Sequence, residues 1–440
     1  MNSLDRDHRA ALAELAARGL ARSAELQLAL HKSQPSVSRL LAALAPQVLA
    51  LGRGRNARYG LAHPIRGRAA QQPLWWVDEA GYSQRLGTLS LLGEGHIVHV
   101  EGPGFEDTVR DGLPWYLAPL RAEGFLGRLL ARQMASSAGL DANPEAWGLE
   151  SILYAALHVH DAPGAIMLGE SALSGAQPLI PTAAAGQAAA LDELAADVAR
   201  TFPVGSSAGG EQPKFLARLE GEGGGHVLVK FTPPRGTPFG ERWHELLHAE
   251  ALAAEVLGHY GVAVAAAHIV ETPRRTYLLS TRFDRVGAAG RRHAVAVGAV
   301  HRAFVAGSYA NWAATCEALV RQGRLPAEAG AQARALFDFG RLIGNSDMHS
   351  GNLSLAVELE SLTKGRFTLA PVYDMLPMRW RPDPLAGGAP DYTAFEPDAT
   401  SLSSPARAPA AEFWSRLARH GRVGKAWRAV AAAMAQRLKA

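Results

Sequence analysis

The chain has 440 residues, of which 20% are charged and 48% hydrophobic, and 45 basic against 41 acidic residues give it a net charge of +4. This composition, without Gly-X-Y or long heptad repeats, excludes a wholly disordered chain, a collagen and an extended coiled coil, and the length predicts about two to four domains. One cysteine, Cys316, excludes an intramolecular disulfide, and the first residues lack the apolar segment of a secretory signal. We therefore expect a cytoplasmic protein that does not enter the membrane.

The charges are unevenly distributed along the chain. Residues 1–70 carry 11 basic and 4 acidic side chains, a net charge of +7, so the other 370 residues sum to −3. A nucleic-acid partner is therefore expected at the N-terminal end. Lysine is rare beside 39 arginines, so each lysine is a candidate for a role that arginine cannot fill. The six lysines are Lys32, Lys214, Lys230, Lys364, Lys425 and Lys439.

Residues 1–66 are predicted to form three helices and a basic hairpin. Amphipathic helices are expected at 5–19 and 23–30, and a third begins after Ser33 and is followed by a hairpin with its tip at 52–56. This order is typical of a winged helix-turn-helix, so we predict binding to double-stranded DNA. The alternative is a helical interaction domain with a solvated basic tip. The predicted DNA contacts are Gln34, Ser36, Ser38 and Arg39 on the third helix and Arg53, Arg55 and Arg58 on the hairpin.

The next part of the chain is predicted to change from strands to helices. The polar segment 66–75 is interpreted as a linker. Repeated glycine turns predict strands between Trp75 and Val109, and helices are expected at 113–140 and 181–199.

The segment RLIGNSDMHSGNLSL, at 341–355, gives the strongest functional signal. Asp347 and Asn352 have the spacing of the protein-kinase catalytic loop, in which the aspartate accepts the hydroxyl proton and the asparagine binds Mg²⁺. Asp374 follows a predicted strand, where a second metal-binding carboxylate is expected. Two other interpretations are a helix-capping turn with His349 as an ordinary loop histidine, and a transition-metal site of Asp347, His349 and Asp374.

The segment VGSSAGGEQPKFL, at 204–216, favours the kinase interpretation. Gly209 and Gly210 would let backbone amides approach phosphate groups closely. The next predicted strand, HVLVKF, carries Lys230 near its end, and a strand lysine after a phosphate loop is the kinase arrangement for binding ATP phosphates. Lys214 precedes that strand and is a second candidate for ATP binding.

The helix predicted at 242–259 carries both acidic residues and histidines. His244 and His248 lie one helical turn apart, but the sequence shows no convincing set of metal ligands among its histidines. Candidate ion-pair partners for Lys230 on this helix are Glu245, Glu250 and Glu255.

The ordered motifs SSAGGEQPK, the strand lysine, RFDR, GNSDMHSGN and YDML resemble the HipA family of bacterial toxin–antitoxin serine/threonine kinases over about residues 75–440. The resemblance implies an α+β, two-lobed protein-kinase-like fold that uses ATP and Mg²⁺. Asp347 and His349 are assigned to the catalytic loop, with Asp347 as the base, and Asn352 and Asp374 to Mg²⁺. The implied ATP-binding residues are Lys230, Gly209, Gly210, Lys214, Glu250 and Phe283. The implied autophosphorylation site is Ser207 or Ser206.

The chain also departs from the family pattern. Thr281 replaces the glutamate that usually precedes RFDR, and HAVAVGAVHRAF replaces the usual acidic segment after it. Typical members lack a DNA-binding domain, so the chain resembles the subfamily with a winged helix-turn-helix fused in front. The expected domains are that DNA-binding domain at 1–66, a HipA-like N-terminal subdomain at 75–200, a kinase N-lobe with the phosphate loop at 201–283, and a mostly helical C-lobe with the catalytic loop at 284–440.

These expectations combine into one predicted function. We expect a toxin kinase that transfers the γ-phosphoryl group of ATP to a protein hydroxyl, limits itself by autophosphorylation and regulates its own promoter through the DNA-binding domain. A separate antitoxin and a second copy of the chain, in a homodimer, are further partners to test. The alternatives are a transcription regulator whose kinase fold senses a nucleotide, and a small-molecule kinase.

Overall fold

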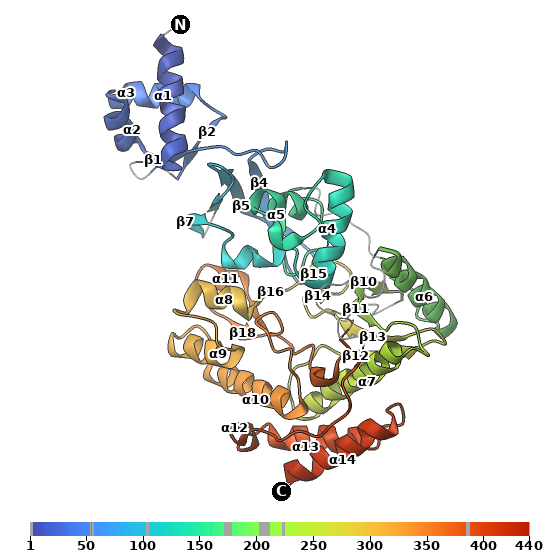
Figure 1. Cartoon of the computed structure of the whole chain (residues 1–440). Helices are drawn as coiled ribbons and strands as arrows, with labels where there is room; N and C mark the ends of the chain where they lie inside the picture. Colours follow the sequence, from blue (N-terminus) through green and yellow to red (C-terminus); the bar gives the residue numbers. More distant parts are fainter. Residues whose placement is uncertain are drawn as a thin grey trace.

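The computed structural model describes residues 3–52, 54, 57–102, 105–159, 161–170, 178–201, 212–221, 225–383 and 388–439, which form a mixed α+β structure (Figure 1). Several residues singled out by the sequence lie outside these ranges. They are Ser206, Ser207, Gly209 and Gly210 of the predicted phosphate loop, and Arg53 and Arg55 of the predicted hairpin tip.

The N-terminal unit projects from one end of the molecule (Figure 1). It consists of α1 (Ser3–Arg18), β1 (Leu20–Arg22), α2 (Ser23–Leu30), α3 (Gln34–Ala43), β2 (Val48–Leu51) and β3 (Arg58–Leu61). The strands form an antiparallel sheet in the order β1-β3-β2, and Leu15, Leu26 and Val37 bury the apolar faces of the three helices in one core. The predicted helices and hairpin are thus present, while their assignment as a winged helix-turn-helix stays a prediction.

A five-stranded antiparallel sheet follows, in the order β7-β6-β5-β4-β8. The predicted linker at 66–75 was wrong in its second half, because β4 already begins at Gln71. The polar side chains of Gln71 and Gln72 do not prevent their backbone from pairing with β5. The elements are β4 (Gln71–Val77), β5 (Ser83–Leu92), β6 (Ile97–Gly102), β7 (Phe105–Asp111), the 3-10 helices η2 (Trp115–Leu120) and η3 (Pro144–Ala146), α4 (Gly124–Ala138), α5 (Leu149–Ala156) and β8 (Ile166–Leu168).

A second five-stranded sheet has the order β12-β13-β11-β10-β9 and lies beside α6 and the long helix α7 (Figure 1). The side chain of Thr237 caps α7 by accepting a hydrogen bond from the Gly240 backbone N–H, and Pro238 stands in its first turn. The bounds are β9 (Leu179–Ile180), α6 (Ala184–Thr201), β10 (Lys214–Leu219), β11 (His226–Phe231), α7 (Pro238–His259), β12 (Ala267–Glu271) and β13 (Thr276–Thr281).

The remaining elements are mostly helical. Two short sheets, β14-β15 and β16-β17-β18, connect this part to the rest. The bounds are β14 (Arg285–Val286), β15 (Gly290–Arg291), β16 (His293–Ala296), α8 (Val297–Phe304), α9 (Trp312–Arg321), α10 (Ala327–Ile343), β17 (Ser354–Val357), α11 (Leu359–Leu362), β18 (Thr368–Leu369), the 3-10 helix η5 (Met378–Trp380), α12 (Ala399–Leu402), α13 (Arg407–Leu417) and α14 (Lys425–Lys439).

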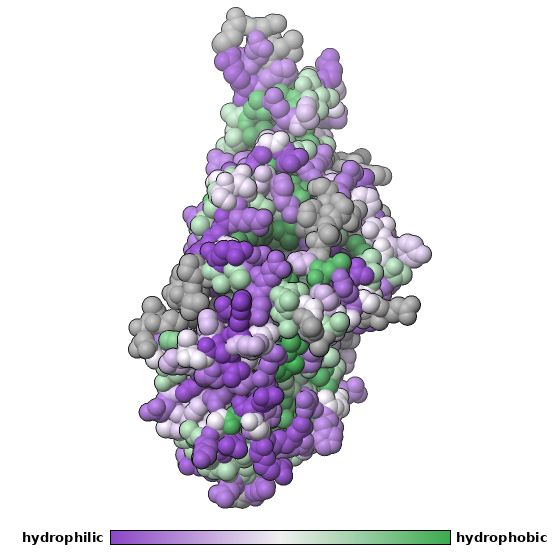
Figure 2. All heavy atoms as spheres, turned by 90° about the vertical axis from the view of Figure 1, so that its right-hand side faces the viewer, coloured by the Kyte–Doolittle hydropathy of each residue, from purple (hydrophilic) through white to green (hydrophobic). Residues whose placement is uncertain are grey.

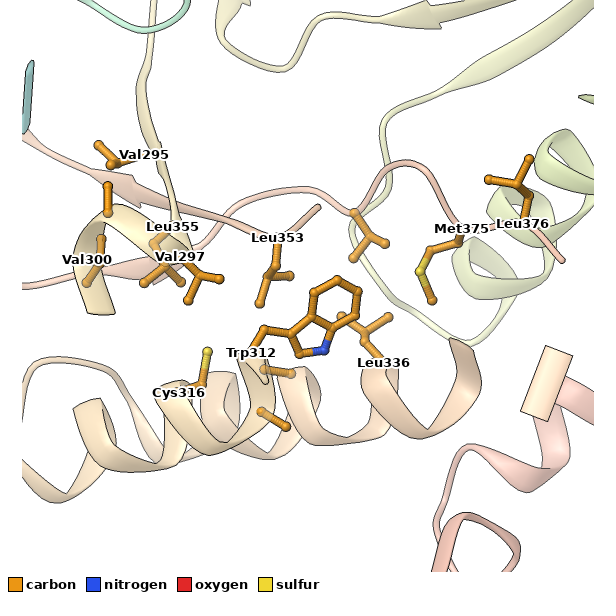
Figure 3. Close-up of a cluster of buried hydrophobic side chains, with 14 of the residues drawn as sticks. Val295, Val297, Val300, Trp312, Cys316, Leu336, Leu353, Leu355, Met375 and Leu376 are labelled. Carbon is orange, nitrogen blue, oxygen red and sulfur yellow. The ribbon is translucent and has the colours of Figure 1, made fainter. Parts of the chain in front are cut away.

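The largest hydrophobic core lies directly beneath the predicted catalytic residues. Trp312 is fully buried between Leu353 and Leu336, with Met375 nearby (Figure 3). Leu353 directly follows Asn352, and Met375 directly follows Asp374. Burying each such apolar side chain stabilises the fold by roughly 1.5–3 kcal/mol, so the core holds the backbone on which both polar residues stand.

The exposed large hydrophobic side chains of the described residues are Leu28, Tyr82, Leu179 and Tyr260. Hydrophilic residues cover most of the face drawn in Figure 2. Among the described helices, none combines the length and the apolar character needed to cross a bilayer.

Candidate active site

Three segments that are distant in the sequence meet at Lys230. This lysine lies on β11, and its Nζ is 2.5 Å from Oε1 of Glu250 on α7. The same ammonium group contacts the carboxylate of Asp374 in the loop after β18. Only 4% of the Lys230 side chain and 7% of the Glu250 side chain are exposed, against 27% for Asp374. We call these three residues the lysine–carboxylate cluster.

The alternation of β11 explains why Lys230 points into this cluster. Val227 and Val229 pack with residues of α6 on one face of the sheet. Lys230 therefore faces the other side, toward α7. Lys214 on β10 is its direct partner in the antiparallel register, so both lysines stand on the same face.

The charges of the cluster are unequal. Burial lowers the pKa of Lys230, the Glu250 carboxylate opposes this change, and the Lys214 ammonium lowers the pKa further. With Lys230 protonated, two carboxylates face one ammonium group, and the cluster carries a net negative charge. This balance leaves room for a cation beside Asp374.

The predicted catalytic loop begins where α10 ends. Gly344 has a φ of 77°, in the left-handed region, and terminates the helix. The next residue, Asn345, is buried, and its Oδ1 accepts a hydrogen bond of 3.0 Å from the Asp347 N–H. Its Nδ2 donates a 3.4 Å hydrogen bond to the backbone carbonyl of Asp374. Asn345 thus joins the loop to the segment that carries the second predicted metal ligand.

The other side chains of the loop are arranged around Asp347. Nδ2 of Asn352 donates a 2.6 Å hydrogen bond to the Asp347 carbonyl, which leaves Asn352 Oδ1 for a metal bond. The Asp347 side chain is 41% exposed, and Nε2 of His349, itself 60% exposed, lies 4.0 Å from its Oδ1. Nδ1 of His349 accepts a hydrogen bond from the Gly351 N–H. The Asp347 carboxylate therefore lies at the surface, within reach of a bulky substrate.

The available oxygen atoms suit Mg²⁺ better than a transition metal. Asn352 Oδ1 and the Asp374 carboxylate are hard oxygen ligands of the type that Mg²⁺ prefers. Among the described residues, no group of three potential His, Cys, Asp or Glu ligands includes Asp347, His349 or Asp374. The transition-metal interpretation of this loop is therefore not supported.

The sequence assigned no role in this site to Tyr373 or Asn345, whereas the family resemblance implied ATP binding for Phe283. Tyr373, next to Asp374, donates a 2.7 Å hydrogen bond to the Gly351 carbonyl, and burial raises its pKa to about 12. Phe283 stacks on the Tyr373 ring at a centroid distance of 5.6 Å, so it supports the loop through packing. In the sequence, Asn345 belongs to the alternative interpretation of residues 345–347 as a helix-capping turn. A buried polar residue beside a motif is the signal that would have identified it, and burial is not readable from one sequence.

The candidate partners of Lys230 on α7 are now distinguished. Glu250 pairs with Lys230, whereas Glu255 pairs with Arg416 on α13. Glu245 accepts hydrogen bonds from the Tyr392 hydroxyl and from the Gly424 backbone N–H.

Comparisons with known proteins address this fold and site. Residues 206–440 match the HipA-like C-terminal domain, and residues 68–177 match the middle domain of YjjJ-like toxins. The chain is 34% identical over 437 residues to Toxin YjjJ of Escherichia coli (strain K12), and the match covers 97% of both proteins. The chain belongs to the HipA-like toxin family.

The relationship extends to solved structures. HipA of Shewanella oneidensis MR-1, determined in a complex with HipB and its operator DNA, has a TM-score of 0.52 and 15% identity, covering 83% of this chain and 95% of its own. This likeness confirms the predicted α+β, HipA-like fold. The HipA-like C-terminal region includes the whole lysine–carboxylate cluster and the loop 345–352. The roles of the individual residues stay predictions.

Proposed function

We propose that the chain is an ATP-dependent kinase that phosphorylates a serine or threonine hydroxyl of a protein. The observation that carries this proposal is the lysine–carboxylate cluster, in which Lys230 is held between Glu250 and Asp374. A strand lysine paired with a helix glutamate is the arrangement that protein kinases use to position ATP phosphates. A regulator that only senses a nucleotide does not need a catalytic base. The Asp347 side chain, in the loop 345–352, is 41% exposed and is available to act as a base, which favours the kinase over this alternative.

Each residue has a defined task in the proposed reaction. Lys230, with Lys214 on the same sheet face, binds phosphate oxygens, and Asp347 accepts the proton of the attacking hydroxyl. Asn352 and Asp374 hold Mg²⁺, which neutralises charge on the phosphates when it is bound. His349 lies beside Asp347 at the rim and contacts the entering substrate. Because Asp347 and His349 are both well exposed, a protein segment fits this rim better than an enclosed small molecule.

The experiment compares phosphate transfer by matched variants. Purified chain is incubated with labelled ATP and Mg²⁺, beside Asp347→Ala and Asp391→Ala, the latter an exposed aspartate outside the site. We expect wild type and Asp391→Ala to incorporate label and Asp347→Ala to lose it by about 100-fold or more, the usual contribution of a general base. Absence of both incorporation and ATP hydrolysis in the wild type would contradict the proposal.

Autophosphorylation is a separate part of the proposal. Ser207 is the proposed acceptor, with Ser206 as the neighbouring alternative, and phosphorylation there would add negative charge to the phosphate loop. Mass spectrometry of the labelled chain, with Ser207→Ala and Ser206→Ala, identifies the residue. Label on neither serine would remove this part of the proposal and leave the kinase proposal standing.

We also propose that the N-terminal unit binds double-stranded DNA. Gln34, Ser38 and Arg39 are exposed on α3, and Arg58 is exposed on β3. Residues 1–70 carry the +7 charge that binding to phosphates requires. A separate antitoxin and a homodimer are further predictions, which co-purification and the molar mass in solution would test.

A further inference from the structure

A group of buried ligand side chains lies outside the kinase site. His244 and His248 on α7 and Glu271 at the end of β12 bring one ligand atom each to within 4.8 Å of one another. Both histidines are buried, and the glutamate is partly exposed. The sequence alone had not indicated this group, because Glu271 joins the histidines only through the packing of α7 on β12. We call it the His–His–Glu group.

The spacing of the two histidines is that of a known zinc-binding pattern. Residues 244–248 read HELLH, and an H-E-x-x-H sequence on a helix places its two histidines on one face, where both can bind one Zn²⁺ ion. A carboxylate from another element then completes a three-ligand His₂Glu set. Here Glu271 supplies that carboxylate.

The histidines are in the state that metal binding requires. Burial lowers the pKa of both His248 and His244, which favours the neutral imidazole that binds metal ions. Nδ1 of His244 lies 2.7 Å from the Thr276 hydroxyl and 3.2 Å from Nη1 of Arg235, and these contacts orient the ring. Nε2 of His248 already lies 3.1 Å from Oε1 of Glu271. A metal ion would take the place of the proton between them.

The surroundings provide access and a fourth candidate ligand. The ring of His420, in the loop between α13 and α14, lies 5.2 Å from the His248 ring, centroid to centroid. A cavity of about 590 Å³ opens beside them, lined by His248, His268 and His420 among others. The cavity therefore reaches the group on the side of His248.

Two arginines compete for Glu271, but neither is fixed there. Arg422 lies 3.3 Å from its Oε1, and its side chain is well exposed and can move away. Arg235 lies 3.9 Å from its Oε2 and 3.2 Å from Nδ1 of His244, and it forms two hydrogen bonds to Glu241, at 2.9 and 3.2 Å. Arg235 thus keeps its own carboxylate when a metal ion binds Glu271.

The position of Glu245, the glutamate of the HELLH segment, argues against peptide hydrolysis at this site. In metalloproteases this residue acts as general base at the metal-bound water. Here Glu245 points elsewhere and accepts hydrogen bonds from the Tyr392 hydroxyl and the Gly424 N–H. The site is thus equipped to hold a metal ion but lacks the base for peptide hydrolysis.

We propose that His244, His248 and Glu271 bind a divalent transition-metal ion of the Zn²⁺ type, with His420 as the neighbouring fourth group. The ion ties α7 to β12 and to the loop between α13 and α14. Since Glu250 of the lysine–carboxylate cluster lies two residues after His248, the metal fixes the helix that carries it. The metal site does not depend on the chain being a kinase.

Metal binding to the full-length chain tests this proposal directly. Protein without a polyhistidine tag, freed of metal by EDTA, is titrated with Zn²⁺ in competition with a chromogenic chelator, and with Co²⁺ for its visible spectrum. The variants are His248→Ala and Glu271→Gln. The matched control is His259→Ala, which removes a third histidine of α7 that is 68% exposed and pairs with Glu412. Asn352→Ala serves as the control for the predicted Mg²⁺ site.

We expect one Zn²⁺ per chain in the wild type, in His259→Ala and in Asn352→Ala. Loss of a residue that only hydrogen-bonds a metal ligand weakens metal binding by about 10–100-fold. Loss of a ligand itself, in His248→Ala and Glu271→Gln, should therefore weaken Zn²⁺ binding by at least about 100-fold. The Co²⁺ form should show the absorption of a four-coordinate site. No stoichiometric binding by the wild type, or equal affinity in Glu271→Gln, would overturn the proposal. Glu271→Gln keeps the result decisive if His248→Ala does not fold, because it changes only the charge of a partly exposed side chain.

Discussion

Burial decides how strongly a single charged residue affects this chain. Lys230 is buried between two carboxylates, whereas Lys364 is exposed. Removing one partner of a buried ion pair leaves an uncompensated charge in a medium of low dielectric constant, which costs far more than losing an exposed pair. Both lysines were candidates for a specific role because lysine is rare in this sequence. Only Lys230 is buried between carboxylates, so only its loss should be costly.

We predict that Lys230→Ala lowers the free energy of unfolding by about 3–5 kcal/mol, because Glu250 is left buried and negative. Lys364→Ala should change it by no more than about 0.5 kcal/mol. Urea denaturation measures both values. In the double variant Lys230→Met with Glu250→Met, the loss should be smaller than in Lys230→Ala, since no buried charge remains on α7. Equal losses of unfolding free energy in Lys230→Ala and Lys364→Ala would show that the buried pair of Lys230 and Glu250 does not contribute this stability.

A second buried residue, His293, should make the free energy of unfolding depend on pH. Burial lowers the pKa of His293 to about 4, and its Nδ1 accepts a hydrogen bond from the Ala165 N–H, while the Asp284 carboxylate acts in the opposite direction. Below its ordinary pKa the unfolded chain binds a proton that the folded chain does not bind until about pH 4. Stability is thus full above about pH 6.5 and falls as the pH drops toward 4, by up to about 3 kcal/mol.

His293→Asn keeps a hydrogen-bond acceptor but cannot take up this proton. We predict that unfolding free energy, measured by denaturant at several pH values, falls less steeply between pH 6.5 and 4 in this variant than in the wild type. All other histidines are the same in both proteins, so the difference between the two curves reports His293. Parallel curves would contradict the prediction.

Between elements, the RFDR segment connects the sheet β12-β13-β11-β10-β9 to the preceding region. Arg282 and Arg285, just after β13, both donate hydrogen bonds to Asp161, which precedes β8. Asp284 accepts hydrogen bonds from the same two arginines and from the Gly164 N–H. Burial alone would raise the pKa of Asp284, but the two guanidinium groups lower it below its usual range. Arg282 and Arg285 thus each pair with both Asp161 and Asp284 across the junction.

We predict that Asp161→Ala lowers the free energy of unfolding by about 3–5 kcal/mol, because it leaves two buried guanidinium groups with one carboxylate. The matched control is Glu79→Ala. It breaks the pair with Arg292 in the same neighbourhood, but both side chains are half exposed, so the cost should be about 1 kcal/mol or less. Urea unfolding compares the two variants. A loss in Asp161→Ala no greater than in Glu79→Ala would show that this network does not hold the junction.

The helices and strands were largely predictable from the sequence, but the contacts between them were not. Helices such as α1 (Ser3–Arg18) follow from apolar periodicity and β11 from its alternation, because these are local properties. Asp347, Asn352 and Lys230 follow from spacing within motifs. The pairing of Glu271 with the histidines of α7 depends on how α7 packs on β12, and no local pattern encodes that. The early start of β4 was missed because strand pairing through the backbone tolerates polar side chains.

For the whole molecule, the N-terminal unit is bonded to the following sheet rather than joined by a free linker. The segment after β3 pairs with the end of β5, through hydrogen bonds of 2.9 Å from the His63 N–H to Leu91 and from the Gly93 N–H to Leu61. The Arg66 N–H donates a 2.9 Å hydrogen bond to Glu150 on α5. DNA bound by this unit would therefore be held in a fixed position relative to the body, which carries the opposite net charge.

This charge distribution predicts how DNA affinity depends on salt. Each arginine that contacts a phosphate releases bound counterions, so the logarithm of the association constant should fall linearly with the logarithm of salt concentration. Arg39→Ala and Arg58→Ala should each weaken binding to a short mixed-sequence duplex and reduce that slope by about one. Arg85→Ala removes an exposed arginine of β5 outside the basic unit and should leave the slope unchanged. Fluorescence anisotropy across a salt series measures all four proteins. A flat salt response in the wild type, or an equal change in Arg85→Ala, would contradict DNA binding through α3 and β3.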